Sequence, residues 1–267
     1  MNKKASPFHP SVWIAYWLSC LCSFACYADL HLDENFSAQR LAPEISYICG
    51  DENHYTLNEA KRLNFAPITH KEISFGFTQS DCWFHFRATN HSNQSLSLVL
   101  SSDFNLFDHI DFYIPFENKI IIKSIGDTIP YHQRELQGRK LAIPFVIKAQ
   151  QSNDYYLHAK TTSTYYLPLQ LSSYPDFINK NNKIDTLIGL FYGMVIGLFL
   201  YHLFLFILTR EKVQLLYIFY VMNTLLFFAA EQGSLFRFWP NATTLNNFSI
   251  YTFAFLVFSS ACLFTRT

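Results

Sequence analysis

The sequence predicts an all-β domain of the jelly-roll or β-sandwich type, followed by α-helical transmembrane segments. Period-two alternation of apolar and polar residues recurs between residues 29 and about 178, as in half-buried strands. The stretch Thr186–Thr209 then runs for 24 residues without an Asp, Glu, Lys or Arg. As a helix it would extend about 36 Å, enough to cross a bilayer core of about 30 Å. Two further charge-free apolar segments follow it, so the chain divides near residue 180.

Composition agrees with this division. Of 267 residues, 50% are hydrophobic and 18% aromatic, whereas only 15% are charged, compared with about 25% in an ordinary soluble domain. The formal net charge is zero, and the sequence shows no basic patch or stripe. A nucleic-acid partner is therefore not expected.

Residues 1–28 have the layout of a secretory signal peptide. Lys3 and Lys4 form a positive start, residues 12–25 are apolar, and Ala28 offers a small residue before a cleavage point, with Cys26 at the −3 position. An uncleaved anchor helix is the alternative. A lipoprotein signal at Cys26 is disfavoured because Ser23 stands where Leu is normally required. We expect export in either case.

Cys49 and Cys82 are the two cysteines of the exported domain. In an oxidising compartment they can form a disulfide, which would close a loop of about 32 residues and add about 3–4 kcal/mol of stability. Two unpaired buried thiols are the alternative. Neither cysteine has the CxxC or His spacing of a zinc site, and the sequence gives no reason to expect a metal or another cofactor.

The predicted sandwich domain covers residues 29–178. Turn-forming segments separate its alternating stretches, and about eight short strands at such spacing favour a sandwich. One short helix is expected over Thr56–Leu63, because Thr56 and Glu59 have the spacing of a capping box. The alternating stretches are Cys82–Ala88, Leu96–Ser101, Ile110–Ile114, Leu141–Ile147, Tyr155–Thr161 and Tyr165–Leu171.

The predicted membrane region covers residues 184–267, with helices at about 186–209, 213–230 and 248–265. The positive-inside rule places Arg210, Lys212 and Arg266 in the cytoplasm and the sandwich outside. Gly189, Gly193 and Gly197 recur at the small-xxx-small spacing that lets helices approach closely. We therefore expect a multi-pass protein of the bacterial inner membrane with its N-terminal domain in the periplasm.

No catalytic motif stands out in the sequence, and a binding site is the stronger hypothesis. The outward positions of the alternating strands carry aromatic rings that can stack on sugar faces and polar groups that can bind hydroxyls. For any single residue, an ordinary role in the outer face of the sheet is the alternative. The candidate ligand-binding residues are Trp83, His85, Arg87, Asp111, Tyr113, Tyr156, His158 and Tyr166, with Lys160 on the same face.

Several segments resemble a known family, the bacterial seven-transmembrane receptors with diverse intracellular signalling modules (7TM-DISM). In the exported part the resemblance rests on the type 2 extracellular sensor domain. The matching segments there are Gly76–Phe86 (GFTQSDCWFHF), Asn90, Asp108–Tyr113 (DHIDFY), Gly126–Pro130 (GDTIP) and Arg134. In the membrane part they are Gly189–Gly193 (GLFYG), Leu200–Phe204 (LYHLF), Tyr217, Gln232–Gly233 and Trp239–Pro240.

This resemblance covers roughly residues 40–267. It implies a jelly-roll periplasmic domain, a carbohydrate-type ligand, and a cytoplasmic output such as a diguanylate cyclase or histidine kinase. The chain departs from the family pattern in two ways: it stops after the third of seven spans, and His202 stands where the family usually has Asn. The sequence is therefore expected to be a fragment or a truncated product with an incomplete helix bundle.

The leading hypothesis is the sensory and membrane part of a receptor, without an enzymatic module in this chain. Its expected partners are the lipid bilayer, a small periplasmic ligand, and a second copy or a signalling partner. A membrane-tethered binding or scaffold module without signal output is the alternative. A periplasmic hydrolase is a third hypothesis, for which Asp108, Asp111 and Asp127 would be the candidate carboxylates.

Overall fold

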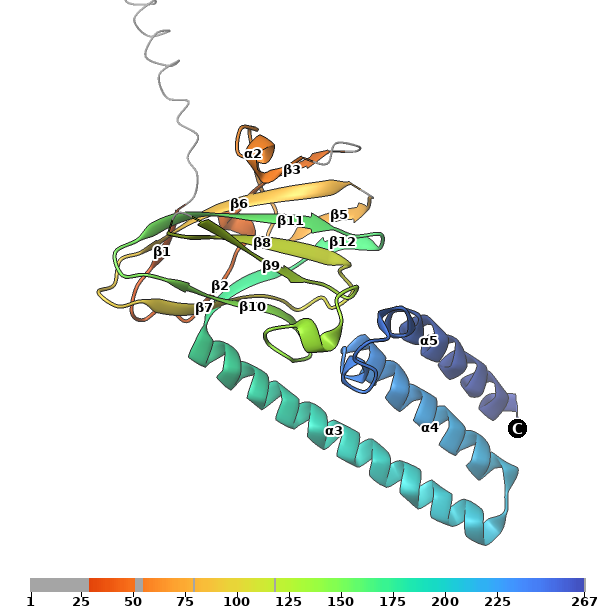
Figure 1. The fold of residues 1–267 in the computed structure, drawn as a ribbon. Helices are drawn as coiled ribbons and strands as arrows, with labels where there is room; N and C mark the ends of the chain where they lie inside the picture. The colour runs from red at the N-terminus through yellow and green to blue at the C-terminus, as the bar shows by residue number, and fades with distance from the viewer. Residues whose placement is uncertain (1–28, 51–54, 79, 118, 267) are drawn as a thin grey trace, which may run out of the picture.

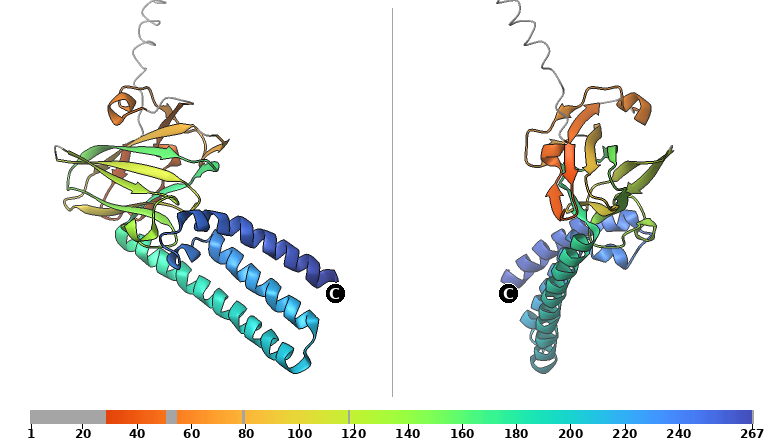
Figure 2. Two further views of the ribbon diagram at one scale, coloured as in Figure 1. Left: turned by 45° about the vertical axis from the view of Figure 1, so that its right-hand side comes forward. Right: turned by 90° about the vertical axis from the view of Figure 1, so that its left-hand side faces the viewer.

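The computed structural model describes residues 29–50, 55–78, 80–117 and 119–266. The expected signal segment, residues 1–28, lies outside them. The described chain forms a β-sandwich from which three long helices run away side by side (Figures 1 and 2). The helices leave from the base of the sandwich, so the sheets and the helices meet over a limited area.

The sandwich consists of a seven-stranded and a four-stranded sheet, with a separate two-stranded ribbon. The seven-stranded sheet has the order β4-β3-β6-β11-β8-β9, and β1 pairs in parallel with the far end of β6. The four-stranded sheet has the order β10-β7-β13-β2, and the ribbon pairs β5 with β12. The other pairings are antiparallel, and the chain repeatedly crosses between sheets, as in a jelly roll.

The strands of the seven-stranded sheet are β1 (Asp29–Leu32), β3 (Ser46–Gly50), β4 (Ala66–Pro67), β6 (Asp81–Asn90), β8 (His109–Phe116), β9 (Lys119–Ile125) and β11 (Ser152–Lys160). Those of the four-stranded sheet are β2 (Ala38–Arg40), β7 (Leu96–Ser102), β10 (Leu141–Ile147) and β13 (Leu169–Ser173), and the ribbon consists of β5 (Ile73–Phe77) and β12 (Thr164–Leu167). The predicted strand Tyr165–Leu171 is thus two strands, because Pro168 has no N–H for a ladder and breaks it.

The core lies between the two sheets and is rich in aromatic side chains. Phe84 and Phe86 of β6 point into it, as the alternation predicts. Phe86 packs beside Phe112 and Tyr155, and Phe84 packs beside Phe75. A disulfide joins Cys49 to Cys82, which lie directly opposite each other on β3 and β6. The predicted helix at 56–63 is shorter, α2 (Leu57–Ala60), although the Thr56 N–H donates to Glu59 at 2.8 Å as in a capping box.

The three helices are α3 (Tyr174–Thr209), α4 (Lys212–Glu231) and α5 (Thr243–Arg266). Each is long and apolar enough to cross a membrane. The helix α3 begins twelve residues before the predicted span, immediately after β13. Ser173 caps it by accepting a hydrogen bond from the Asp176 N–H, and Pro175 lies in its first turn.

The first turns of α3 pack against the four-stranded sheet. Phe177 lies on Val99 and Ala142, which explains why Val99 is buried although it points away from the core. At 36 residues α3 is about 54 Å long, more than a bilayer core requires. Its first part therefore belongs to the sandwich and the rest to the membrane, with no loop between them.

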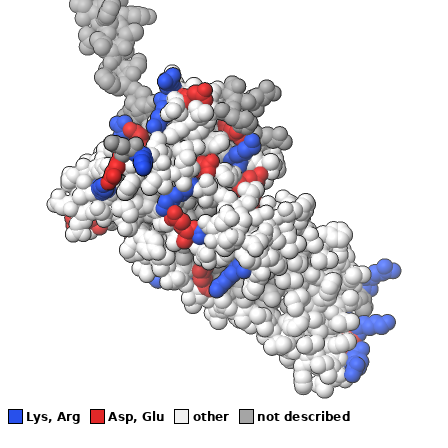
Figure 3. Space-filling view, viewed as in Figure 1, with Lys and Arg blue, Asp and Glu red and all other residues white. Residues whose placement is uncertain are grey.

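Charged side chains divide the molecule in the same way. They are spread over the sandwich and the first turns of α3, whereas the apolar lengths of the helices are nearly free of them until the ends far from the sandwich (Figure 3). Arg210, Lys212 and Arg266 lie at those helix ends. In the described chain no heavy atom lies within 4 Å of a Cβ placed on Gly189, Gly193 or Gly197, so α4 and α5 do not pack on the glycine face of α3.

Candidate functional site

Most of the predicted ligand-binding residues lie together on the outer face of the seven-stranded sheet. The register places Trp83 of β6 opposite His158 of β11, which lies opposite Asp111 of β8. The next row contains His85, Tyr156 and Tyr113 in the same order of strands. We call this surface the outer face; it comprises Asp81, Trp83, His85, Arg87, His109, Asp111, Tyr113, Asp154, Tyr156, His158 and Lys160.

The centre of the outer face is an aromatic stack around Trp83. Its ring lies 4.8 Å from the ring of His158 and 5.2 Å from that of Tyr113, measured between centroids. Trp83 is only 2% exposed, and its indole N–H has no hydrogen-bond partner among the described residues. Trp83 therefore supports the face from below, while the edges of Tyr113 and His158 are what a ligand could touch.

Charged groups surround this stack. The Asp111 carboxylate accepts hydrogen bonds from His109 at 2.9 Å and from Ser124, and His158 Nδ1 lies 3.9 Å away. Burial by itself would raise the pKa of Asp111, but the hydrogen bonds from His109, His158 and Ser124 outweigh it and hold that pKa well below its usual range. The bond to Asp111 raises the pKa of His109. On the other side of His158, Asp81 lies 3.4 Å from Lys160.

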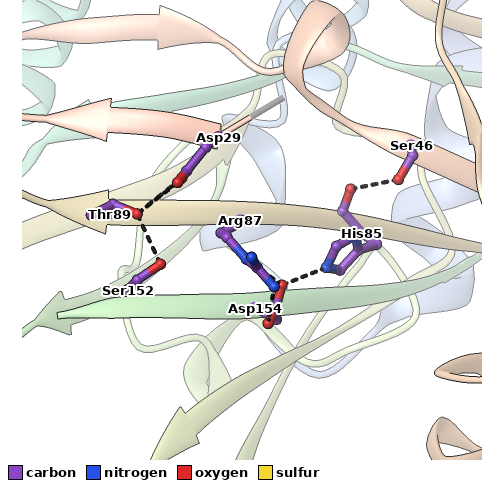
Figure 4. Close-up of polar contacts among 7 residues, drawn as sticks. All are labelled: Asp29, Ser46, His85, Arg87, Thr89, Ser152 and Asp154. Carbon is purple, nitrogen blue, oxygen red and sulfur yellow. Dashed lines mark hydrogen bonds and ion pairs between the residues drawn. The ribbon is translucent and has the colours of Figure 1, made fainter. Parts of the chain in front are cut away.

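A second polar group lies one row further along β6 and β11 (Figure 4). His85 and Arg87 both point at Asp154, with His85 Nε2, Arg87 Nε and Arg87 Nη2 each 2.9 Å from its oxygens. The hydrogen bond from His85, followed by those from Arg87, lowers the pKa of Asp154 to about 2 although burial opposes the change. These charges neutralise each other, so this end of the outer face is polar but carries little net charge.

The segment that follows α2 covers part of the outer face. Phe65 packs against His85 and Tyr156, and the Lys61 ammonium lies 5.6 Å from the centre of the Tyr156 ring. His85 is consequently only 7% exposed. The accessible part of the face is therefore the side of β11 and β8, around Tyr113, His109 and Lys160.

Tyr166 does not belong to the outer face. It lies on β12 in the separate ribbon, where its hydroxyl donates to Glu72 at 2.8 Å and its ring packs against Phe104. Sequence reasoning also omitted Asp81, His109 and Asp154 from the face. Extending each alternating stretch by one period of two, from Trp83, Asp111 and Tyr156, would have found all three.

The sandwich also touches the membrane helices through a second contact, the junction, which comprises the sandwich loop 126–140 and the α4–α5 loop, residues 232–242. The Tyr131 N–H donates to the Pro240 carbonyl at 2.9 Å, and the Asn105 amide donates to the Gln232 carbonyl at 3.3 Å. The Arg134 guanidinium lies 4.9 Å from the centre of the Phe236 ring, and Phe236 is 2% exposed.

Close backbone approach shapes both sides of the junction. A Cβ on Gly126 would lie 2.0 Å from the Asp108 carbonyl oxygen, so only glycine fits there. Gly233 has φ +72°, and a Cβ on it would lie 3.0 Å from the Arg139 carbonyl oxygen. Gly126 thus packs tightly within the sandwich, whereas Gly233 lets the α4–α5 loop lie directly against the sandwich loop.

Two buried charged residues lie within the junction. Arg134 donates to the Gly126 carbonyl at 2.8 Å, and burial lowers its pKa to about 10. Burial, and then the nearby charge of Asp108, raise the pKa of Asp127 to about 6, although Asn247 of α5 and Arg134 act in the opposite direction. Asp127 is 3% exposed. The junction thus contains a carboxyl group whose charge is costly at neutral pH.

Several of the segments that resemble the receptor family meet at this junction: Gly126–Pro130 and Arg134 on the sandwich side, and Gln232–Gly233 and Trp239–Pro240 on the helix side. Comparison with known families agrees with the resemblance. The family model described as 7TMR-DISM extracellular 2 matches residues 42–173, and the model described as 7TM diverse intracellular signalling matches residues 184–267. Together they cover most of the chain. The chain belongs to the 7TM-DISM receptors. Residues 42–173 are thus the sensor region of a membrane receptor, and the helices are part of its membrane region.

Other comparisons add little to this. No curated protein matches the receptor chain. A β-glucosidase from Kluyveromyces marxianus in complex with glucose matches with 8% identity and a TM-score of 0.29, over 48% of this chain and 16% of that enzyme. A family 35 carbohydrate binding module from Clostridium thermocellum matches with 12% identity and a TM-score of 0.25, over 51% of this chain and 98% of the module. Neither likeness is close enough to indicate a ligand.

Proposed function

We propose that this chain is the sensory and membrane part of a signalling receptor that binds a small periplasmic ligand, of the carbohydrate class, on its outer face. The accessible edges of Tyr113 and His158 can contact the apolar face of a sugar ring. His109 and Lys160 beside them can exchange hydrogen bonds with hydroxyl groups.

The observation that carries a receptor function is the double attachment of the sandwich to the helices. The strand β13 continues into α3 without an intervening residue, and the junction holds the α4–α5 loop. Binding can influence the helices only if it favours one position of the sandwich over another. With two attachments, such a change would reach both α3 and α4.

We further propose that the receptor lies in the bacterial inner membrane with the sandwich in the periplasm. Arg210, Lys212 and Arg266 would then face the cytoplasm, as the positive-inside rule requires. The matched regions are sensory and membrane regions, so we assign no reaction to this chain. An output module, such as a cyclase or kinase, would belong to another part of the receptor.

The test is calorimetric titration of the whole chain in lipid nanodiscs with mono- and disaccharides. Tyr113→Ala removes a ring from the outer face and should weaken binding of any sugar that binds. Tyr166→Ala is the matched control, because Tyr166 has a similar ring on the separate ribbon. Binding that both variants reduce equally, or no binding of any sugar, would refute the outer face as the ligand site.

Transmission is tested separately by hydrogen exchange of residues 232–242 with and without the bound sugar. A receptor should show changed exchange in the α4–α5 loop when ligand binds the sandwich. Binding without any change there would leave a membrane-tethered binding module as the better description.

A further inference from the structure

A groove lies at one side of the sandwich, away from the outer face. It is a cavity of about 600 Å³ between β9, the last strand of the seven-stranded sheet, and β10, the last strand of the four-stranded sheet. Pockets that bind small molecules are typically 300–1,000 Å³ and mostly apolar. The apolar lining of this edge groove includes Ile114, Phe116, Ile121, Pro144, Val146 and Tyr174.

The two sheets separate here because their edges do not pair with each other. Pro144 lies within β10 and has no N–H to offer to another strand. Lys123 of β9 spans the gap instead: its ammonium donates to the Pro144 carbonyl and to Glu135, each at 2.7 Å. Lys123 thereby ties the edges of the two sheets together at one point of the edge groove.

The walls of the edge groove expose apolar side chains to solvent. Phe116 is 49% exposed, Ile121 40% and Val146 55%. These three residues come from β8, β9 and β10 and line one cavity. Single exposed apolar residues are common on protein surfaces, but a cluster of them in one cavity indicates a binding site. An apolar ligand would remove all of them from water together.

Of the charged residues that line the edge groove, Lys148 is the one that can meet an acidic ligand, because Lys123 is already bound to Glu135. Lys123 and Lys148 lie along it, together with one carboxylate, Glu117. Lys148 is 3.5 Å from Glu117, both side chains are more than half exposed, and its ammonium lies 5.4 Å from the centre of the Phe116 ring. Such an exposed ion pair is weak, so a ligand carboxylate above Phe116 can replace Glu117 as the partner of Lys148.

The edge groove also reaches the membrane helices, because Tyr174 is the first residue of α3. We infer that the edge groove is a second ligand site, for a small organic acid with an apolar body, whose carboxylate pairs with Lys148 and whose body packs on Ile121 and Val146. This site goes beyond the sugar-binding outer face: it takes a different class of ligand and touches α3 directly.

The experiment uses phenylbutyrate and its neutral analogue phenylbutyramide, titrated by calorimetry into the whole chain in nanodiscs, with empty nanodiscs subtracted. Ile121→Trp fills the edge groove. Ile120→Trp is the matched control, since Ile120 is the neighbouring residue of β9, is also exposed, and does not line the cavity. Lys148→Gln tests the charge without changing the apolar walls.

We expect phenylbutyrate to bind the unmodified chain and Ile120→Trp equally, and not to bind Ile121→Trp. Lys148→Gln should weaken phenylbutyrate by about fivefold and leave phenylbutyramide unchanged. Heat no greater than with empty nanodiscs would overturn the proposal. Equal losses of phenylbutyrate binding in the two tryptophan variants would also overturn it. Self-association of the chain that Ile121→Trp alone abolishes would overturn it too, because the groove would then be a contact between two copies.

Failure here can be distinguished from failure of the proposed function. The sugar titrations depend on Tyr113 of the outer face, and the acid titrations depend on Ile121 and Lys148 of the edge groove. A receptor that binds sugars but not organic acids would keep the proposed function and lose only this second site.

Discussion

Replacement of Asp127 by asparagine is expected to stabilise the protein at neutral pH and to remove part of its pH dependence. Asp127 is buried in the junction, and its pKa rises from the ordinary 3.8 to about 6. A carboxyl whose pKa is raised in the folded state supports folding below its unfolded pKa of about 4. That support is lost as the pH rises through about 6.

The size of the effect follows from the pKa. A rise from 3.8 to about 6 corresponds to about 3 kcal/mol of unfolding free energy, lost in full by about pH 7.5. Asparagine has nearly the same shape and carries no charge. Asp127→Asn should therefore gain up to about 3 kcal/mol near pH 7.5, and only about 1 kcal/mol near pH 4.5.

The assay is thermal unfolding of the whole chain in nanodiscs, followed by tryptophan fluorescence at several pH values. Each variant is compared with the unmodified chain at the same pH, so that the titration of histidines such as His109 cancels. A gain of 3 kcal/mol should raise Tm by several degrees.

Asp154→Asn is the matched control, because it makes the same chemical change with the opposite expected sign. The partners His85 and Arg87 lower the pKa of Asp154 to about 2. The contribution of Asp154 to folding stability is therefore present above about pH 4 and is lost as the pH falls through about 2. Because that contribution is present at neutral pH, Asp154→Asn should destabilise the protein there. The reasoning is refuted if Asp127→Asn keeps the pH slope of the unmodified chain, or destabilises it near pH 7.5 as Asp154→Asn does.

Three further predictions concern the fold and the topology. Gly126→Ala should destabilise the protein by about 2–4 kcal/mol in thermal melts, because its Cβ would clash with the Asp108 carbonyl; a Gly138→Ala control, where no heavy atom is near, should melt within about 0.5 kcal/mol of the unmodified chain. Cys49→Ser with Cys82→Ser should cost about 4 kcal/mol in the chain-entropy model, and reducing agent should lower the Tm of the unmodified chain but not of this variant. A reporter fused after Arg210 should be active only in a cytoplasmic format; activity in a periplasmic format would invert the topology.

The sequence could predict the outer face because period-two alternation assigns each side chain of a strand to one face. Phe84 and Phe86 point into the core and His85 and Arg87 away from it, as their order requires. The start of α3 was also within reach of prediction. Ser173, Pro175 and Asp176 form a recognisable helix start, although hydropathy alone marks only the apolar run that begins at Thr186.

Other features depend on contacts between residues far apart in the chain. The alternation places Trp83 among the candidate ligand-binding residues, but His158 and Tyr113 pack on its ring and leave it 2% exposed, and Phe65 covers the neighbouring His85. No local pattern encodes such a cover. The junction likewise cannot be predicted from a local pattern. Asp127 and Asn247 are 120 residues apart in the sequence, and only the folded arrangement of sandwich and helices brings them together.

The direct run from β13 into α3 determines what kind of movement the sandwich can impose on the membrane. Because α3 continues β13 without a loop and its first turns pack on the sandwich, a tilt of the sandwich carries α3 with it. The helix α3 then acts as a lever about 54 Å long. A rocking of about 5° at its upper end would displace the Arg210 end by about 5 Å, close to the rise of one helical turn. Rotation of a few degrees is therefore enough to change which residues meet at the cytoplasmic side.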